Sequence, residues 1–240
     1  MRRAILYPIL RNLVRFLLWL FVDLEITGEE NLTEERPLII IANHFSLFEA
    51  PLIELHLPFK ITFFAAIELE QNVLVRFLLS VVDAIMVHRS RADREALRQA
   101  LDLLAAGGRL QIMPEGGIDP ELRDTLARGE ERPFTEGMNV RFSAQLIEAR
   151  PGSAYLATRS QARILPIAIL GSDQILANMR RLKRTKVSMH IGPVFGPLTL
   201  DPALRGPARR QQLDAYGDEM MHHIAALMPP ENRGPYNHSV

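Results

Sequence analysis

Residues 38–51 read Leu38-Ile39-Ile40-Ile41-Ala42-Asn43-His44-Phe45-Ser46-Leu47-Phe48-Glu49-Ala50-Pro51. The four apolar residues at the start, three of them β-branched, predict a buried strand. A histidine and a carboxylate come directly after this strand. In α/β proteins, binding and catalytic groups gather at the carboxyl ends of strands. This stretch therefore predicts a functional site on an α/β fold.

His44 and Glu49 lie five residues apart, so on one helix they would be about 500° of rotation apart (a net angle of ~140°) and on different faces. They meet only if His44 stays in the loop and a helix begins near Ser46, a good N-cap residue. The carboxylate then holds one ring nitrogen and leaves the other free as a general base. Ser46 and Glu49 also have the spacing of a capping box, in which Glu49 accepts the cap's backbone amide.

The composition describes an ordinary globular protein without cysteine chemistry. The chain has 240 residues, 48% of them hydrophobic, which is enough for one moderately large domain or two small ones. Basic and acidic residues number 28 each, so a general nucleic-acid binder is not indicated. The absence of cysteine excludes disulfides, thiolate metal sites and cysteine nucleophiles, and it suits a reducing cytosol.

Residues 1–22 predict an amphipathic helix that associates with a membrane surface. Arg11 and Arg15 interrupt the apolar run, so it is too short to span a bilayer. Arginines for anionic headgroups and the aromatic residues Trp19 and Phe21 fit an interfacial helix. The alternative is a core helix that packs on the domain.

The rest of the chain, residues 23–240, predicts one α/β domain with a mixed, mainly parallel sheet flanked by helices. The expected strands are 24–27, 37–42, 61–66, 81–87, 109–113, 164–170 and 187–191. The expected helices are 72–80, 91–106 and 208–228, the second stopped by Gly107-Gly108 and the third by Pro229-Pro230. Periodicity fades over residues 117–150, which predicts an insertion that is either a lid or a solvated charged excursion.

Polar residues follow two further strands. Arg89 follows the 81–87 strand, and a guanidinium suits a phosphate or carboxylate through paired hydrogen bonds. Glu115 follows the 109–113 strand, where it can fix a hydroxyl group or pair with Arg89. The glycines Gly116 and Gly117 let the backbone approach a ligand closely.

In this order and spacing, the motifs resemble those of the glycerolipid acyltransferases, the enzymes that acylate lysophosphatidic acid and its relatives. Asn43-His44, an acid five residues after the histidine, and Pro51 are similar to the first motif. Residues 82–89 resemble the second motif, 112–116 the third and 164–169 the fourth, while 150–157 and 224–234 also resemble family segments. The resemblance covers roughly residues 23–234, apart from 117–150.

This resemblance implies a role for each matched residue. His44 and Glu49 are the catalytic pair, and Arg89 binds the acceptor's phosphate. Glu115, Gly116 and Gly117 belong to the substrate site, with backbone amides at the two glycines stabilising the oxyanion. Pro166, inside the fourth motif, lines the acyl-chain side.

The chain departs from the family pattern at several positions. Glu49 replaces an aspartate. Gly117 and Ile118 stand where threonine and arginine are usual, and Ala66 stands where a lysine is often found two residues before a glutamate, here Glu68. Two cations near the acceptor's phosphate are therefore missing, and arginines of 117–150 or Arg159 are the possible replacements.

The expected reaction transfers a fatty acyl group to the hydroxyl of a lysophospholipid such as 1-acylglycerol-3-phosphate. His44 takes the acceptor's proton, and the alcohol attacks the thioester of acyl-CoA or acyl-carrier protein, which serves as co-substrate. No cofactor or metal is expected, since His44 and Glu49 are too few ligands. The expected location is the cytoplasmic face of a membrane, peripheral or monotopic. The alternatives are a catalytically altered membrane-surface scaffold and a thioester or lipid hydrolase.

Overall fold

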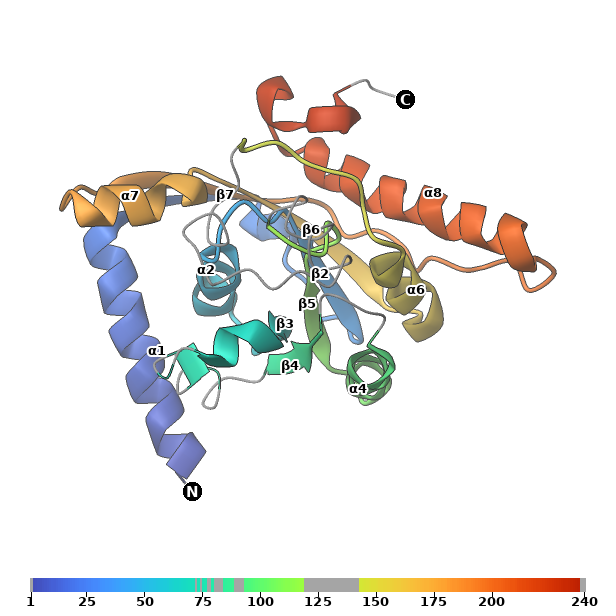
Figure 1. Cartoon of the computed structure of the whole chain (residues 1–240), viewed down its shortest axis with the longest axis horizontal. Helices are drawn as coiled ribbons and strands as arrows, with labels where there is room; N and C mark the ends of the chain where they lie inside the picture. Colours follow the sequence, from blue (N-terminus) through green and yellow to red (C-terminus); the bar gives the residue numbers. More distant parts are fainter. Residues whose placement is uncertain are drawn as a thin grey trace.

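The computed structural model describes residues 2–71, 73, 75–76, 79, 84–88, 93–118 and 143–237. Its centre is a seven-stranded sheet in the order β1-β7-β6-β2-β5-β3-β4 (Figure 1). The strands are β1 (Val22–Thr27), β2 (Leu38–Ala42), β3 (Thr62–Ala66), β4 (Ala84–Val87), β5 (Arg109–Ile112), β6 (Arg163–Leu170) and β7 (Thr185–Ile191). Strands β2 to β6 are mutually parallel, while β7 runs antiparallel to β6 and β1 runs parallel to β7. The predicted mixed, mainly parallel sheet is confirmed.

Helices cover both faces of this sheet. They are α1 (Arg2–Phe21), α2 (Glu49–His56), α4 (Arg94–Ala105), α6 (Pro151–Ser160), α7 (Ile175–Arg180) and α8 (Gly206–Ala225). Short 3-10 turns are η1 (Glu29–Asn31), η2 (Ile67–Gln71), η4 (Ser172–Gln174), η5 (Pro230–Asn232) and η6 (Gly234–Tyr236).

Strand β2 lies between two hydrophobic cores. Ile39 and Ile41 pack into the core formed with α4, α6 and α8. Leu38 and Ile40 pack into the opposite core, to which α2 and α7 contribute. Every residue of β2 is buried, because a strand covered on both faces needs apolar side chains throughout.

Local signals account for the ends of α4. Asp93 is its N-cap, and its carboxylate accepts the Ala96 amide at 3.1 Å. At the other end Gly107 has a φ of 74°, which glycine adopts without strain. The predicted helix over 91–106 is thus confirmed for 94–105.

Two predicted segments fall largely outside the described residues. They are most of the 72–80 helix, together with residues 81–83 of the fourth strand, and residues 119–142 of the 117–150 insertion. Where the insertion is described, it is part of the domain: Ile118 and Leu146 are buried, and the Leu146 amide donates to the Asn232 carbonyl at 2.9 Å.

Helix α1 lies along one side of the domain and is anchored at its carboxyl end (Figure 1). Leu18 and Val22 are buried, whereas Phe16 is 55% and Trp19 66% exposed. Most of α1 is therefore exposed, in contrast to the alternative prediction of a helix packed into the core. Within the described residues, no helix combines the length and the hydropathy that a bilayer crossing requires.

Candidate active site

The loop that carries His44 is fixed to the neighbouring strand by Asn43. The buried Asn43 carboxamide donates to the Ile169 carbonyl at 2.9 Å and accepts the Ile169 amide at 2.7 Å. These two bonds reproduce with a side chain the pairing of one further strand residue. The backbone that leads into His44 is therefore held at the carboxyl edge of the sheet.

Glu115 fixes the same loop from the other side. Its Oε2 accepts the His44 backbone amide at 2.6 Å, and its Oε1 accepts the Ile147 amide at 3.0 Å. The carboxylate is buried and does not line the pocket described below. The structure thus gives Glu115 a positioning role, joining the His44 loop to residues 143–150, in place of the direct contact with a substrate hydroxyl that was expected.

Glu49 contacts both Ser46 and His44, the two partners that the sequence offered. Its Oε1 accepts the Ser46 amide at 2.9 Å and the Ser46 hydroxyl at 3.0 Å, which are contacts within the loop because α2 begins only at Glu49. Its Oε2 faces His44 Nδ1 at 3.4 Å. Contact with Ser46 and orientation of the histidine are compatible because the carboxylate has two oxygens.

The start of α2 differs from the expectation. The helix begins at Glu49 and not at Ser46, with Phe48 in the N-cap position. Ser46 lies in the bent loop before the helix, and its hydroxyl accepts the Phe48 amide at 3.1 Å. The bend keeps His44 off the helix, which is the condition for the histidine and the acid to meet.

Ser172 is a site residue that sequence reasoning missed. It follows β6, is fully buried, and donates its hydroxyl to Glu49 Oε1. This bond from a strand end 123 residues away locks the carboxylate with Oε2 turned toward the histidine. The only signal in the sequence was that Ser172 follows a strand, as His44 does.

Asp173, the next residue, carries a second carboxyl group near Glu49. Burial, and to a lesser degree the charge of Glu49, raise the pKa of Asp173. The carboxyl groups of Glu49, at the start of α2, and Asp173, after β6, make this the acidic side of the site. A positive imidazolium at His44 is stabilised by that charge.

His44 lines the pocket and leaves its second ring nitrogen, Nε2, free. The side chain is 12% exposed, and no described residue makes a hydrogen bond to Nε2. The 3.4 Å separation on the Nδ1 side is long for a hydrogen bond, and such contacts commonly tighten when substrate binds. Nε2 is therefore the atom available to take a proton from a bound ligand.

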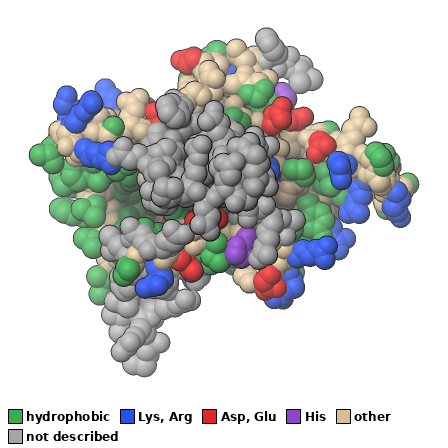
Figure 2. Space-filling view, viewed as in Figure 1, with side chains coloured by type: hydrophobic (Ala, Val, Ile, Leu, Met, Phe, Trp, Pro, Cys, Tyr) green, Lys and Arg blue, Asp and Glu red, His purple; other side chains and the backbone are tan. Residues whose placement is uncertain are grey.

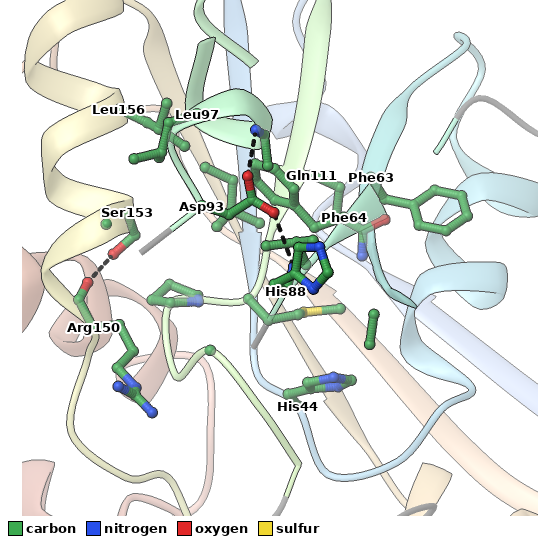
Figure 3. Close-up of a pocket in the computed structure, with 18 of the residues that line it drawn as sticks. His44, Phe63, Phe64, His88, Asp93, Leu97, Gln111, Arg150, Ser153 and Leu156 are labelled. Carbon is green, nitrogen blue, oxygen red and sulfur yellow. Dashed lines mark hydrogen bonds between the residues drawn. The ribbon is translucent and has the colours of Figure 1, made fainter. Parts of the chain in front are cut away.

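A pocket of about 480 Å³ opens beside His44 and has the size of a small-molecule site (Figure 3). Its walls come from the ends of β3, β4 and β5 and from α4 and α6. Most of the lining is apolar and includes Phe63, Phe64, Val87, Leu97, Ile112 and Leu156. Such a lining suits a fatty chain next to a proton acceptor.

His88 and Arg150 bring cationic or titratable side chains to the same pocket (Figure 3). The His88 backbone amide donates to Asp93 Oδ2 at 3.1 Å. This bond, with the amide of Ala96, holds the pKa of Asp93 below its ordinary value. Arg150 precedes α6, and its own amide donates to the Pro114 carbonyl at 2.7 Å, which fixes it next to the third motif.

The residues expected to bind the acceptor's phosphate are placed as follows. Arg89 lies outside the described residues. Arg159 is exposed on α6 and does not line the pocket, whereas Arg150, the last residue of the 117–150 segment, does. Ile118, in the position of the family's arginine, is buried.

The structure describes three further residues of the expected site. Gly116 lines the pocket, and its amide donates to the Met113 carbonyl at 2.9 Å, so this amide is held in a turn and is not directed at an oxyanion. Pro166 is buried within β6 and does not line the pocket. A proline has no backbone N–H to donate to a neighbouring strand. Here that position faces residues 192–195, where Gly192 donates to the Pro166 carbonyl and Phe195 pairs with Ile164, so no strand bond is lost. Gly117 does not line the pocket either.

The described residues also include no group of three or more histidine or acidic side chains placed to hold a metal ion.

Two curated proteins are similar to this chain in sequence. A probable 1-acyl-sn-glycerol-3-phosphate acyltransferase of Mycoplasma genitalium is 26% identical over 69% of this chain and 57% of its own length. A 1-acyl-sn-glycerol-3-phosphate acyltransferase of Chlamydomonas reinhardtii is 22% identical over 88% of this chain and 54% of its own. The chain thus spans little more than half the length of these curated relatives.

The fold is shared with a solved structure. The crystal structure of PlsC, the 1-acyl-sn-glycerophosphate (LPA) acyltransferase of Thermotoga maritima, superposes with a TM-score of 0.60. The match covers 94% of this chain and 79% of that one at 23% identity. The family model described as Acyltransferase matches residues 23–170, from β1 to the end of β6. With His44, Glu49 and the pocket inside that range, the chain belongs to the acyltransferase family.

Proposed function

We propose that the protein transfers a fatty acyl group from a thioester donor to the hydroxyl of a lysophospholipid such as 1-acylglycerol-3-phosphate. The observation that carries the proposal is the histidine–carboxylate pair at the edge of an apolar pocket, with Nε2 turned toward the ligand space. The donor is acyl-CoA or acyl-carrier protein.

The chemistry follows from the protonation states of His44. Nε2 accepts the proton of the acceptor hydroxyl while the oxygen attacks the thioester carbonyl, and Glu49 stabilises the resulting imidazolium. Collapse of the tetrahedral intermediate breaks the carbon–sulfur bond. The proton on Nε2 then passes to the departing thiolate, so an ester and a thiol leave and His44 is neutral again.

The nucleophile in this scheme is the acceptor and not a serine of the protein. Ser46 and Ser172 are buried and donate to Glu49, on the far side of the histidine from Nε2. Ser153 lines the pocket, but its hydroxyl donates to the Arg150 carbonyl at 2.8 Å. Direct transfer between the two substrates therefore fits these contacts better than an acyl-enzyme.

Arg150 is our candidate for binding the acceptor's phosphate. Its guanidinium lines the same pocket as His44, and planar arginine groups recognise phosphate through paired hydrogen bonds. This assignment replaces one of the two cations that the sequence lacks at Ala66 and Ile118.

We also propose that the protein works on the cytoplasmic face of a membrane, where it meets these lipids. The apolar face of α1 is exposed at Phe16 and Trp19. Beside its end lies a turn that we call the basic turn, residues 180–184, with four cations and Leu182, which is 84% exposed. Arg184 ties this turn to α1 by donating to the Trp19 carbonyl at 3.2 Å. Figure 2 shows the hydrophobic side chains and the cations together on this side, as in an interfacial helix on anionic lipid.

The proposal is tested with purified protein, labelled acyl-CoA and acyl-carrier protein, and lysophospholipids with and without phosphate. We expect acyl transfer that is strongest with lysophosphatidate and that falls about 10²–10⁴-fold in His44→Ala. His56→Ala is the control, because His56 binds the Leu52 carbonyl at the end of α2, away from the pocket.

Each alternative gives a different result in this assay. Release of fatty acid at the same rate without an acceptor would identify a hydrolase. A wild-type protein that binds vesicles but transfers nothing to any acceptor would identify a scaffold.

A further inference from the structure

Residues 143–150, which we call the strap, connect the C-terminal end of the chain with the pocket. The strap runs from the turns η5 and η6 to the start of α6 (Figure 1). Arg150, its last residue, lines the pocket together with His44 (Figure 3). The strap is neither helix nor strand, so its place in the fold depends on the groups of other segments that pair with its backbone.

Asn232 holds the strap at two points. Its carbonyl accepts the Leu146 amide at 2.9 Å, and its carboxamide donates to the Ala144 carbonyl at 2.5 Å. Leu146 is buried, and a Cβ added at Gly234 would lie 2.1 Å from the Leu146 carbonyl oxygen. The strap is thus packed directly against the C-terminal turns.

The other end of the strap sets the position of Arg150. The Arg150 amide donates to the Pro114 carbonyl at 2.7 Å. Its side chain crosses Gly116, where an added Cβ would lie 2.6 Å from Arg150 Cγ. The guanidinium therefore reaches the pocket over a glycine, and a shift of the strap moves it relative to a bound ligand.

His44 has anchors that do not involve the strap. The strap reaches its loop through Glu115, which accepts the amides of both segments. Asn43 fixes the same loop to β6 by two further hydrogen bonds. A looser strap is therefore expected to displace Arg150 more than His44.

We propose that Asn232 is a positioning residue for the acceptor, because it holds the strap that brings Arg150 to the acceptor's phosphate. The inference rests on the proposed function only in that Arg150 binds this phosphate. Asn232 does not line the pocket, so it acts through the strap and not by touching the lipid.

Binding of two soluble lipids that differ only in the phosphate tests the proposal without turnover. Dissociation constants are measured for 1-octanoylglycerol 3-phosphate and for 1-octanoylglycerol. Asn232→Asp places an acceptor oxygen opposite the Ala144 carbonyl, and Asn232→Ala removes the donor. We expect Asn232→Asp to weaken binding of the phosphate lipid about 10-fold, Asn232→Ala to weaken it less, and both to leave 1-octanoylglycerol unaffected.

A double-mutant cycle distinguishes positioning of Arg150 from a general structural effect. Arg150→Ala should weaken binding of the phosphate lipid at least as much as Asn232→Asp does. When Arg150 is already alanine, Asn232→Asp should have no further effect, because both changes remove the same contact with the phosphate. A general structural role would weaken binding of both lipids, and its effect would add to that of Arg150→Ala.

Asn31→Asp is the matched control. Asn31 also ends a 3-10 turn, η1, and its carboxamide also donates to a backbone carbonyl, that of Ile191 at 2.9 Å. It does not line the pocket, so this variant should keep the wild-type preference for the phosphate lipid.

Three results overturn the proposal: a wild type without a preference for the phosphate lipid, a preference that survives in both Asn232 variants, or additive effects in the cycle. Thermal unfolding is measured for every variant. Two Asn232 variants are used because a folding defect in Asn232→Asp leaves Asn232→Ala to decide.

Turnover separates this inference from the proposed function. Acyl transfer to lysophosphatidate with a KM that Asn232→Asp and Asn232→Ala leave unchanged would overturn the inference and leave the proposed function standing. A preference for the phosphate lipid that depends on Asn232 and Arg150, in a protein that transfers no acyl group from either donor, would do the reverse.

Discussion

The Glu49 carboxylate makes its effect on His44 testable at the scale of a single residue. In Glu49→Gln, the amide oxygen can keep the bonds from Ser46 and Ser172, which leaves the NH₂ group facing His44 Nδ1. An NH₂ donor at Nδ1 places the ring proton on Nε2, so the base is blocked. We expect an unfolding temperature close to wild type and a loss of roughly 10²–10⁴ in kcat. Normal turnover in this variant would show that the carboxylate serves only as a cap.

Ser172 acts through Glu49, and we expect it to behave as a positioning residue. Ser172→Ala removes one bond to a buried carboxylate, so stability should fall by about 1.5–3 kcal/mol. The substrate does not touch Ser172, so kcat should fall about tenfold while KM stays the same. Ser172→Thr, which keeps the hydroxyl, should recover most of the rate.

Steady-state kinetics on folded protein test whether Ser172→Ala lowers kcat without changing KM. Ser188→Ala is the control, because Ser188 bonds to His190 on β7 and does not line the pocket. A purely structural role for Ser172 would lower the unfolding temperature of Ser172→Ala without changing the kcat of its folded fraction.

At the scale of one element, α4 depends on its N-cap. Asp93→Ala should cost about 0.5–2 kcal/mol, while Asp93→Asn keeps a capping oxygen and costs less. The pKa of Asp93 is lowered in the folded protein, so its contribution is present above the unfolded value of about 3.9 and is lost as pH falls through the folded value. The stability gap between wild type and Asp93→Asn should therefore narrow on acidification.

Urea unfolding at a series of pH values between neutrality and strong acid measures this gap. Asp214→Asn, at an exposed position of α8, serves as the control for a general loss of negative charge. A gap that stays constant down to strong acid would mean that the charge of Asp93 contributes nothing to the cap. Because α4 supplies Ala96 and Leu97 to the pocket, the weaker cap should also lower activity as the pocket wall loosens.

At the scale of the whole molecule, the charge distribution predicts how the protein meets a membrane. Arg181→Glu with Lys183→Glu removes two cations of the basic turn, each worth about 1 kcal/mol on anionic lipid. Binding to anionic vesicles at low salt should weaken at least about 30-fold, and high salt should weaken wild type in the same direction.

The matched control reverses two cations elsewhere, with Arg209→Glu and Arg210→Glu. These exposed residues lie on α8, on the opposite side of the domain from α1 (Figure 1). Vesicle sedimentation that responds equally to both double variants would show that net charge, and not this surface, controls binding.

Much of this architecture was predictable because its signals are local. The β-branched run of β2, the cap and glycine stop of α4, and the alternation of strands with helices depend on residues close together in sequence. The pair of His44 and Glu49 was predictable for the same reason, since only five residues separate them. The exact start of α2 was not, because the Ser46 bend competes with helix formation there.

The sequence alone thus determined the fold class, the family and the pairing of His44 with Glu49. Only the tertiary structure decided what surrounds that pair, because the partners come from other strand ends. Glu115 lies 71 residues from His44 and Ser172 lies 123 from Glu49, and no local pattern records which oxygen meets which donor.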